Sequence, residues 1–186
     1  DDVDIIAGIR NGDQACIKAL LNQYGDRLLR SAFLLCQNDT DAEDLVEETV
    51  IQAVKSISYF AGTSALYTWL HGILLNKSRH YSRSRVRRKM LFTDRIADEN
   101  MQGAMVAIRP EIIREASELA AALRRLSPAH REVVVLRFFE GMKLEEIAGH
   151  LGVNSSTIRS RLRHALHQLR KIIPNSFNET PLSGNS

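Results

Sequence analysis

Apolar residues recur every three or four positions along most of the chain, which is the spacing of helices that bury one face. Between residues 3 and 37 only Asn11-Gly12-Asp13 interrupts this repeat, so we expect two helices there. A second break, Asn38-Asp39-Thr40-Asp41, contains a threonine three residues before Glu43, the spacing of a capping box. We therefore predict that the next helix starts at Thr40. Its expected buried stripe contains Ala42, Leu45, Val46, Thr49, Val50, Ala53, Val54 and Ile57.

A short loop from Ser58 to Ser64 leads into a further helix that runs into a strongly basic stretch. At helical spacing, this helix carries Trp69, Leu70, Ile73, Leu74 and Lys77. No acidic residue lies between Lys77 and Phe92, and the cations of this stretch are Lys77, Arg79, Arg83, Arg85, Arg87, Arg88 and Lys89. Such a run is either a solvated face or a phosphate-binding face, and the absence of acids favours phosphate contact.

The helical pattern weakens over residues 93–110, which we interpret as an interdomain linker. Pro110-Glu111 then opens a new helix, and Ser127-Pro128 predicts the start of the next, with serine at the cap and proline in the first turn. That helix should end at Gly141, and its expected core is Val133, Val134, Leu136 and Phe138. These breaks predict domains at 1–92 and 111–173, followed by a flexible tail at 174–186.

Residues 144–166 have the pattern of two short helices joined by a tight turn at Gly152. The first helix has one apolar face, formed by Leu144, Ile147, Ala148 and Leu151. An alanine, a glycine four residues later and Ile158 six residues after that give the spacing of a DNA-binding helix-turn-helix. Val153 and Ile158 should fill the angle between the helices. Only Met142-Lys143 disagrees, because it is a poor cap for the first helix.

The second helix of this pair should start at a cap formed by Asn154 or Ser155. Its inner face is Ile158, Leu162, Ala165, Leu166 and Leu169. Its outer face is Ser155, Ser156, Thr157, Arg159, Ser160, Arg163 and His167. No acid lies between Glu146 and Glu179, so the outer face suits the major groove, where arginine can bind guanine. The alternative, a helical hairpin with a solvated basic face, is less favoured because turn, cap and charge all agree with DNA binding.

The composition supports this pattern and limits the remaining possibilities. With only 10 Gly and 4 Pro in 186 residues, we predict an all-α protein of two helical domains joined by a linker, the C-terminal one containing the helix-turn-helix. We find no signal peptide and no apolar run near the ~20 residues that span a bilayer, so we expect a cytoplasmic protein without membrane insertion. For Cys16 and Cys36 we favour reduced core thiols over a disulfide or redox pair.

Enzymatic chemistry is not indicated by the reactive side chains. The histidines are His71, His80, His130, His150, His164 and His167, and none has metal-ligand spacing to Cys or to acids. His164 and His167 lie three residues apart on a helix, but a surface or DNA-facing role is favoured for them. No nucleophile motif appears, and we therefore expect no enzyme activity, no catalytic residue, no metal and no cofactor.

Further motifs distinguish a repressor from a basal transcription factor. In the first half they are Asp41-Ala42-Glu43-Asp44-Leu45-Val46-Glu47-Glu48-Thr49, Phe60-Ala61-Gly62-Thr63-Ser64, Thr68-Trp69-Leu70 and Asn76. In the second half they are Leu126-Ser127-Pro128-Ala129-His130-Arg131-Glu132-Val133, Glu146-Ile147-Ala148 and Ser160-Arg161-Leu162. Over about residues 8–172, and in this order, the chain resembles regions 2 and 4 of the extracytoplasmic-function (ECF) sigma factors, without a region 3 domain between them.

The resemblance implies a subunit that binds core RNA polymerase and directs it to specific promoters. In the family, the helix corresponding to residues 41–57 binds the polymerase clamp helices. By motif match, the polymerase contacts would be Asp44, Glu47, Glu48 and Val50. From the residues alone, the acids of this helix can also be a solvated first turn that stabilises the helix dipole. The family commonly has glutamine where this chain has Glu47.

The resemblance also implies that residues 59–64 and the helix from Thr68 to His80 read the promoter −10 element. Family members capture a base flipped from the non-template strand, which needs aromatic faces, polar edges and cations. The candidate residues are Tyr59, Phe60, Tyr67, Asn76, Lys77, Arg79 and Arg83. For Trp69 a core position is favoured, since an aromatic residue at helical spacing is usually buried. Many relatives have a basic residue where this chain has Tyr67.

The helix-turn-helix would then read the −35 element in duplex form, through the outer face from Ser155 to His167. Many family members are held inactive by an anti-sigma factor, so promoter DNA, core polymerase and an anti-sigma factor are the expected partners. The alternative function is a helix-turn-helix regulator that acts without core polymerase. Co-migration with core polymerase distinguishes the two.

Overall fold

The computed structural model describes the backbone of residues 1–91 and 119–172, and the side chains of residues 1–80 and 119–172. The chain divides into two compact units, 1–116 and 117–186, which we describe separately as unit 1 and unit 2. The described residues are helical and include no strand, which confirms the all-α prediction. The predicted linker at 93–110, the helix opening at Pro110 and the tail at 174–186 lie outside the described residues.

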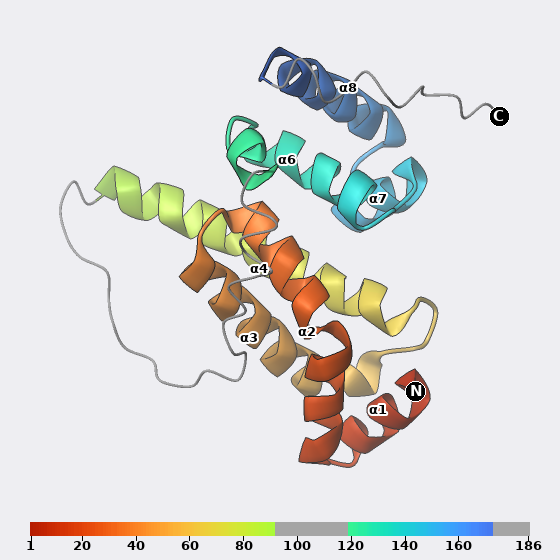
Figure 1. Cartoon of the computed structure of the whole chain (residues 1–186). Helices are drawn as coiled ribbons and strands as arrows, with labels where there is room; N and C mark the ends of the chain where they lie inside the picture. The colour runs from red at the N-terminus through yellow and green to blue at the C-terminus, as the bar shows by residue number, and fades with distance from the viewer. Residues whose placement is uncertain (92–118, 173–186) are drawn as a thin grey trace. The chain divides into compact units, whose positions relative to one another are not determined.

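Unit 1 is a bundle of helices around a leucine-rich core (Figure 1). Its elements are α1 (Asp2–Arg10), α2 (Gln14–Cys36), α3 (Asp39–Ser56), the short 3-10 turn η1 (Ile57–Tyr59) and α4 (Leu66–Leu91). The helices α2, α3 and α4 pack against one another, and α1 packs on α2. The most deeply buried large side chains of this bundle are Leu20, Leu28, Leu29, Leu34, Leu45, Leu66, Leu70, Leu74 and Leu75.

The break at residues 37–41 confirms a new helix there but shifts its start. Gln37 ends α2 in the left-handed conformation (φ 65°), and the next residue, Asn38, is extended. The Asn38 side-chain oxygen accepts a hydrogen bond from the Asp41 backbone N–H at 2.9 Å. The predicted cap at Thr40 is therefore wrong: Asn38 is the N-cap and α3 begins at Asp39. Asparagine is the stronger cap of the two residues, and its backbone already has the extended cap geometry.

The first helix, α1, is tied to the bundle by buried apolar residues and by a polar cluster. Ile5 and Ile9 are each only 5% exposed. The Tyr24 hydroxyl donates a hydrogen bond to the Asp2 carboxylate at 2.5 Å, and the Gln23 amide donates to the same oxygen at 2.9 Å. Desolvation, followed by the hydrogen bond to Asp2, raises the pKa of Tyr24 to about 12. The start of α1 is thereby held against α2.

Unit 2 contains the helix-turn-helix and the helix that supports it. Residues 119–123 are helical, followed by α6 (Pro128–Val134), the π-helical turn η2 (Val135–Phe139), α7 (Leu144–Leu151) and α8 (Ser155–Ile172). The predicted start at Ser127-Pro128 is confirmed, because the Ser127 hydroxyl accepts a hydrogen bond from the His130 N–H at 3.4 Å.

The π turn after α6 changes which side chains face the core. The Glu140 N–H bonds to the Val135 carbonyl at 3.1 Å, a wider turn than that of an α-helix. Val133, Val134 and Leu136 are buried as predicted, but Phe138 is 53% exposed. The prediction of Phe138 as a core residue is therefore wrong, because an α-helical repeat was extended across a turn of different pitch.

The helix-turn-helix has the predicted geometry. Gly152 ends α7 in the left-handed conformation (φ 64°), and the next N–H, that of Val153, bonds to the Ala148 carbonyl at 3.0 Å. Ile158 is 0% exposed and Ala148 is 5% exposed. The poor cap at Met142-Lys143 is compensated from within the helix, since the Glu146 carboxylate accepts a hydrogen bond from the Lys143 N–H at 2.6 Å.

Both cysteines are free thiols, but neither is fully buried. They lie on the same helix, α2, and the separation of 20 positions from Cys16 to Cys36 corresponds to about 30 Å along a helix. A disulfide between them would need Cα atoms less than about 7 Å apart, so they cannot pair within one folded chain. Desolvation, followed by the charge of Asp13, raises the pKa of the Cys16 thiol and disfavours its reactive thiolate.

Within the described parts of the chain, no helix is both long and apolar enough to cross a membrane.

Candidate nucleic-acid and protein interfaces

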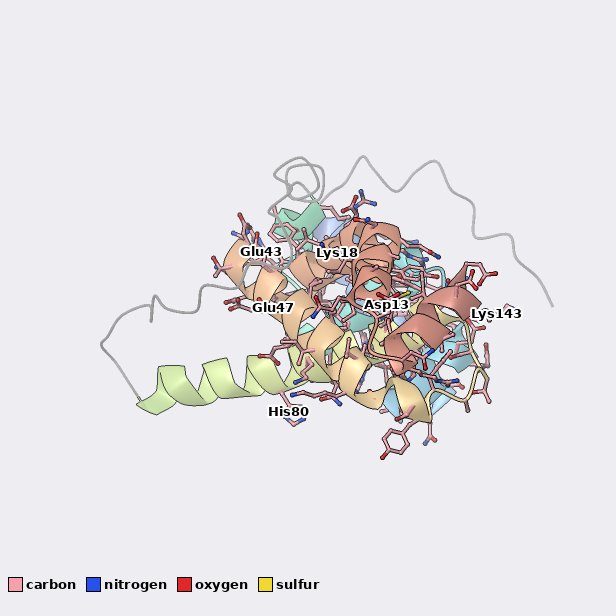
Figure 2. All side chains as sticks on the ribbon, turned by 90° about the horizontal axis from the view of Figure 1, so that it is seen from below. Asp13, Lys18, Glu43, Glu47, His80 and Lys143 are labelled. Carbon is pink, nitrogen blue, oxygen red and sulfur yellow. The ribbon has the colours of Figure 1, made fainter. Side chains whose placement is uncertain are left out.

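The outward face of α3 is acidic and includes one large apolar side chain. Asp44 and Glu48 are exposed, and Glu47 is half-buried. Glu43 and Glu47, one helical turn apart, extend outward from α3 (Figure 2). Desolvation, followed by Asp41 and Glu48, raises the pKa of Asp44. Burial, followed by Asp39 and Asp44, likewise raises the pKa of Glu43. In both shifts desolvation is the larger cause, and the charges of neighbouring carboxylates add to it.

The apolar member of this face is Ile51 rather than Val50. Val50 is 1% exposed and belongs to the stripe that α3 packs into the bundle. The prediction of Val50 as a polymerase contact is therefore corrected: its side chain is a core residue. Ile51 is 41% exposed and lies three residues after Glu48, on the same side of the helix. The sequence alone does not distinguish Val50 from Ile51, since two adjacent apolar residues of one helix can both be buried, as Leu45 and Val46 are.

The turn between α3 and α4 presents one aromatic ring to solvent and buries another. Tyr59 is 85% exposed, the most exposed large hydrophobic side chain among the described residues. Its neighbour Phe60 is only 8% exposed, and the Phe60 ring packs against Trp69 of α4 with the centroids 5.1 Å apart. Phe60 is therefore corrected from a DNA contact to a core residue. Trp69, half-buried beneath it, has a largely structural position, as favoured from the sequence.

Tyr67 also belongs to the core. It is 7% exposed, its ring lies 5.6 Å from that of Tyr24, and the guanidinium carbon of Arg27 lies 3.7 Å from its centroid. A ring covered on one side by arginine and on another by tyrosine cannot stack on a base without unpacking the bundle. The prediction of Tyr67 as a DNA contact is therefore corrected. The sequence does not show which of Tyr59, Phe60 and Tyr67 is exposed, since these three aromatic residues lie within nine positions of one another.

The polar residues of α4 remain accessible. Asn76 is exposed, while Lys77 and Arg79 are half-buried. The Lys77 ammonium lies 3.1 Å from the Glu48 carboxylate, which joins a predicted DNA contact to a predicted polymerase contact. The Arg83 side chain and the remaining cations of the basic run lie outside the described side chains.

In unit 2, the outer face of α8 keeps every predicted residue accessible. The exposed members are Ser156, Arg159, Arg163 and His167, and the half-buried members are Ser155, Thr157 and Ser160. Because α8 begins at Ser155, Asn154 occupies the position before its first helical residue. The Arg159 guanidinium lies 3.5 Å from the Glu145 carboxylate of α7, an exposed pair with little effect on stability. The side chains that would face a major groove are thus all at least partly accessible.

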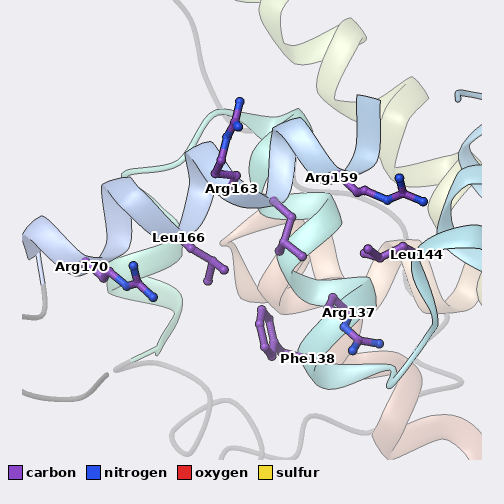
Figure 3. Close-up of a pocket in the computed structure, with 8 residues that line it drawn as sticks. Arg137, Phe138, Leu144, Arg159, Arg163, Leu166 and Arg170 are labelled. Atoms are coloured by element: carbon purple, nitrogen blue, oxygen red, sulfur yellow. The ribbon is translucent and has the colours of Figure 1, made fainter. Parts of the chain in front are cut away.

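Beside this surface lies a groove of about 390 Å³ with an apolar floor and cationic walls (Figure 3). Its floor is formed by Phe138, Leu144, Leu162 and Leu166. Its walls are formed by Arg137, Arg159, Arg163 and Arg170. Phe138, which lies in the π turn and is 53% exposed, is one of the residues that line the groove. The helical repeat of the sequence did not indicate this site, because it placed Phe138 in the core.

No group of three or more potential metal ligands lies together among the residues that the structure describes. The rings of His130 and His164 are neighbours, with centroids 6.1 Å apart, and His167 lies on the exposed face of α8.

These features define a class of protein: an all-helical DNA-binding protein in which a helix-turn-helix is combined with a second helical module. Two family descriptions match the chain, one to each module. Residues 20–88 match Sigma-70 region 2, and residues 122–171 match Sigma-70, region 4.

Known proteins agree over nearly the whole chain. The ECF RNA polymerase sigma factor SigE of Mycolicibacterium smegmatis is 37% identical over 184 residues, covering 92% of this chain and 68% of that protein. RNA polymerase sigma factor SigV of Bacillus subtilis is 28% identical over 84% of this chain and 90% of its own length. The chain belongs to the ECF sigma factor family, and it is therefore an alternative sigma factor that acts in transcription initiation. Sigma factors are regulatory proteins.

Solved structures share the fold. Sigma factor RpoE of Bartonella quintana, crystallised with the anti-sigma factor NepR, has a TM-score of 0.61 at 27% identity and covers 86% of this chain and 99% of its own. CnrH, solved with the cytosolic domain of CnrY, has a TM-score of 0.64 at 24% identity, covering 92% of this chain and 96% of its own, and supports the fold alone. None of these comparisons supports a regulator that acts without polymerase.

Proposed function

We propose that this sigma factor binds core RNA polymerase through α3 of unit 1 and reads promoters through two separate surfaces, one on each unit. The observation that carries the proposal is the division of charge between the helices. The outward face of α3 is acidic, whereas α8 contains no acidic residue over its whole length. A single chain thereby offers one surface that repels DNA and another that attracts it.

The proposed polymerase contact consists of Asp44, Glu47, Glu48 and Ile51. An acidic face with one exposed apolar residue fits a partner helix that is cationic with an apolar seam. The two raised carboxyl pKa values support a cationic partner, because a nearby positive charge would favour the ionised form of both acids.

The proposed −10 surface consists of Tyr59, Asn76, Lys77 and Arg79, with Arg83 included on the sequence motif alone. Tyr59 supplies the exposed ring on which an unpaired base can stack, and stacking of this kind contributes about 1–3 kcal/mol per base. Phe60, which is buried next to Tyr59 and packs against Trp69, anchors the main chain beside it. The cations of α4 supply contacts to the sugar-phosphate backbone.

The proposed −35 surface is the outer face of α8, from Ser155 to His167. Arginine on such a helix can bind the O6 and N7 atoms of guanine, and hydroxyl groups near its start can bind bases or phosphates. We further propose the domain limits 1–92 and 111–173 for the two modules, a flexible tail at 174–186, and a cytoplasmic site of action without enzymatic activity.

The groove of unit 2, which is lined by arginines and apolar residues, has the chemistry to bind a protein partner. The Bartonella quintana sigma factor was crystallised in complex with an anti-sigma factor. We infer that this chain also has an anti-sigma factor, and that an acidic amphipathic helix of that partner enters the groove. Apolar residues would cover Phe138 and Leu166, and acids would pair with Arg159 and Arg163. Since both arginines also belong to the −35 surface, such a partner would compete with promoter DNA.

Size-exclusion chromatography with core polymerase, followed by transcription from randomised promoters, tests the proposed function. The chain should co-migrate with core polymerase, and the selected promoters should share two short elements separated by a fixed spacer. Asp44→Asn/Glu48→Gln should weaken co-migration, whereas Val50→Leu, which retains a buried apolar side chain, should not. Failure of the wild-type chain to co-migrate would refute the proposal and favour a regulator that acts alone.

A further inference from the structure

The turn that carries Tyr59 is held by a residue from the other end of unit 1. The Arg10 side chain, in the last turn of α1, donates one hydrogen bond from Nη2 to the Phe60 carbonyl at 2.8 Å and a longer one from Nε to the Ile57 carbonyl at 3.4 Å. These two carbonyls lie on either side of Tyr59. Arg10 is separated from the turn by nearly 50 positions in sequence, so the contact exists only in the folded chain.

Buried residues lie on both sides of Tyr59, while the tyrosine ring itself projects into solvent. Ile57 is 3% exposed and Phe60 is 8% exposed, so the main chain is anchored on both sides. Between them, the tyrosine ring projects to 85% exposure. An exposed aromatic ring on a mobile turn would lose much of its stacking energy to the entropy of ordering. Two charge-assisted hydrogen bonds to the turn reduce that cost before DNA arrives.

The helix that carries Arg10, α1, is packed against α2. Ile5 and Ile9 bury one side of α1, and the Asp2 carboxylate is held by the hydroxyl of Tyr24 and the amide of Gln23. Because α1 is fixed to α2 in this way, the guanidinium is positioned by the bundle rather than by the turn that it holds. A movement of α1 would therefore move the Tyr59 turn.

We propose that Arg10 is a positioning residue for promoter opening: it holds the 57–60 turn so that the Tyr59 ring is preorganised to stack on an unpaired base. The inference rests on the proposed function, in which Tyr59 belongs to the −10 surface. Arg10 itself does not contact the base. Its contribution therefore depends entirely on Tyr59.

The test uses holoenzyme reconstituted from core polymerase and the full chain. The probe is a promoter duplex selected by the wild-type holoenzyme from a randomised library, with 2-aminopurine in the non-template strand of its −10 element. Arg10→Ala should slow opening about tenfold, the loss expected for one disordered stacking residue. The dissociation constant of the closed complex should change by less than about twofold, because the −35 surface is unaltered.

Two matched variants separate positioning from charge. Lys18→Ala removes one cation from an exposed position on α2 and should leave the opening rate unchanged. Arg10→Lys retains the charge but offers one nitrogen in place of two separate donors, so it should recover little of the opening rate. Full recovery by lysine, or an equal loss in Lys18→Ala, would mean that charge alone matters and would overturn the proposal.

A double-mutant cycle decides whether Arg10 acts through Tyr59. Opening by Arg10→Ala/Tyr59→Ala should be no slower than opening by Tyr59→Ala alone. Losses that multiply, or an Arg10→Ala holoenzyme that opens as fast as wild type while Tyr59→Ala is slow, would overturn the role of Arg10 but leave the −10 surface standing. A normal opening rate in Tyr59→Ala would overturn the −10 surface and this inference together. All variants are compared at a temperature well below the midpoint of their thermal unfolding.

Discussion

The two units carry their proposed DNA-reading surfaces in different ways. In unit 2, a single helix supplies the whole surface, within the stretch from Ser155 to His167. In unit 1, Tyr59 comes from a 3-10 turn, Asn76 and Lys77 come from α4, and Arg10 of α1 holds the turn in place. A surface on one helix follows from periodicity alone, whereas a surface assembled from several segments depends on how the helices pack.

Burial shows the same contrast. All seven residues predicted on α8 remain at least partly exposed. In unit 1, two of the predicted DNA contacts, Phe60 and Tyr67, are core residues. The difference lies in what aromatic rings can do: a ring serves equally well in a core or against a base, whereas arginine and serine on an acid-free helix rarely serve a core.

The largest effect is expected on the free energy of unfolding, when the buried Tyr67 and the exposed Tyr59 of unit 1 are each replaced by alanine. Tyr67→Ala should destabilise the chain by about 3–5 kcal/mol, because it removes a buried aromatic side chain from the bundle. Tyr59→Ala should change the free energy of unfolding by less than about 0.5 kcal/mol, because that ring is exposed. Denaturant unfolding followed by circular dichroism measures both. Equal losses in the two variants would contradict the division between core and surface.

The single-helix surface of unit 2 should depend on its arginines. Arg163→Ala should weaken binding of holoenzyme to a selected promoter duplex by about 1–3 kcal/mol if the side chain binds a base, with relaxed sequence preference at that position. Lys171→Ala, an exposed cation beyond the predicted surface, is the matched control. If both variants lose the same affinity and the same salt dependence, α8 contributes charge without sequence reading.

The neighbouring residues Val50 and Ile51 provide a test of similar design on α3. Val50→Ala should lower stability by about 1–2 kcal/mol and leave polymerase affinity unchanged, because its side chain is in the core. Ile51→Ala should leave stability nearly unchanged and reduce the affinity for core polymerase by about 1 kcal/mol, the loss of one exposed apolar contact. Fluorescence anisotropy of the labelled chain with core polymerase measures affinity. The reverse pattern would restore Val50 as the contact.

The smallest effect is expected for the ion pair between Glu48, a proposed polymerase contact, and Lys77, a proposed DNA contact. The side chains of Glu48 and Lys77 are 56% and 33% exposed, so their pair should contribute less than about 1 kcal/mol to stability. Glu48→Gln should therefore scarcely change unfolding, but it should release Lys77 and strengthen binding of the free chain to single-stranded DNA at low salt. Weaker binding of Glu48→Gln would show that the pair orients Lys77 rather than masking it.

Prediction from sequence was most accurate where local interactions decide the structure. The break at Gly12, the start at Ser127 and the turn at Gly152 were all predicted, because caps, prolines and glycines act on their own neighbours. Errors arose where two local solutions competed. Asn38 rather than Thr40 caps α3, and a π turn rather than a regular helix carries Phe138.

The sequence by itself determined the all-helical class, the helix-turn-helix and the outer face of α8, because each depends on residues close together along the chain. Only the tertiary structure decided which aromatic residue of unit 1 is presented, which apolar residue of α3 faces outward, and that Arg10 holds the Tyr59 turn. The physical reason is that burial and long-range hydrogen bonds are properties of packed helices. Helical periodicity places a residue on a face, but only the neighbouring helix determines whether that face is covered.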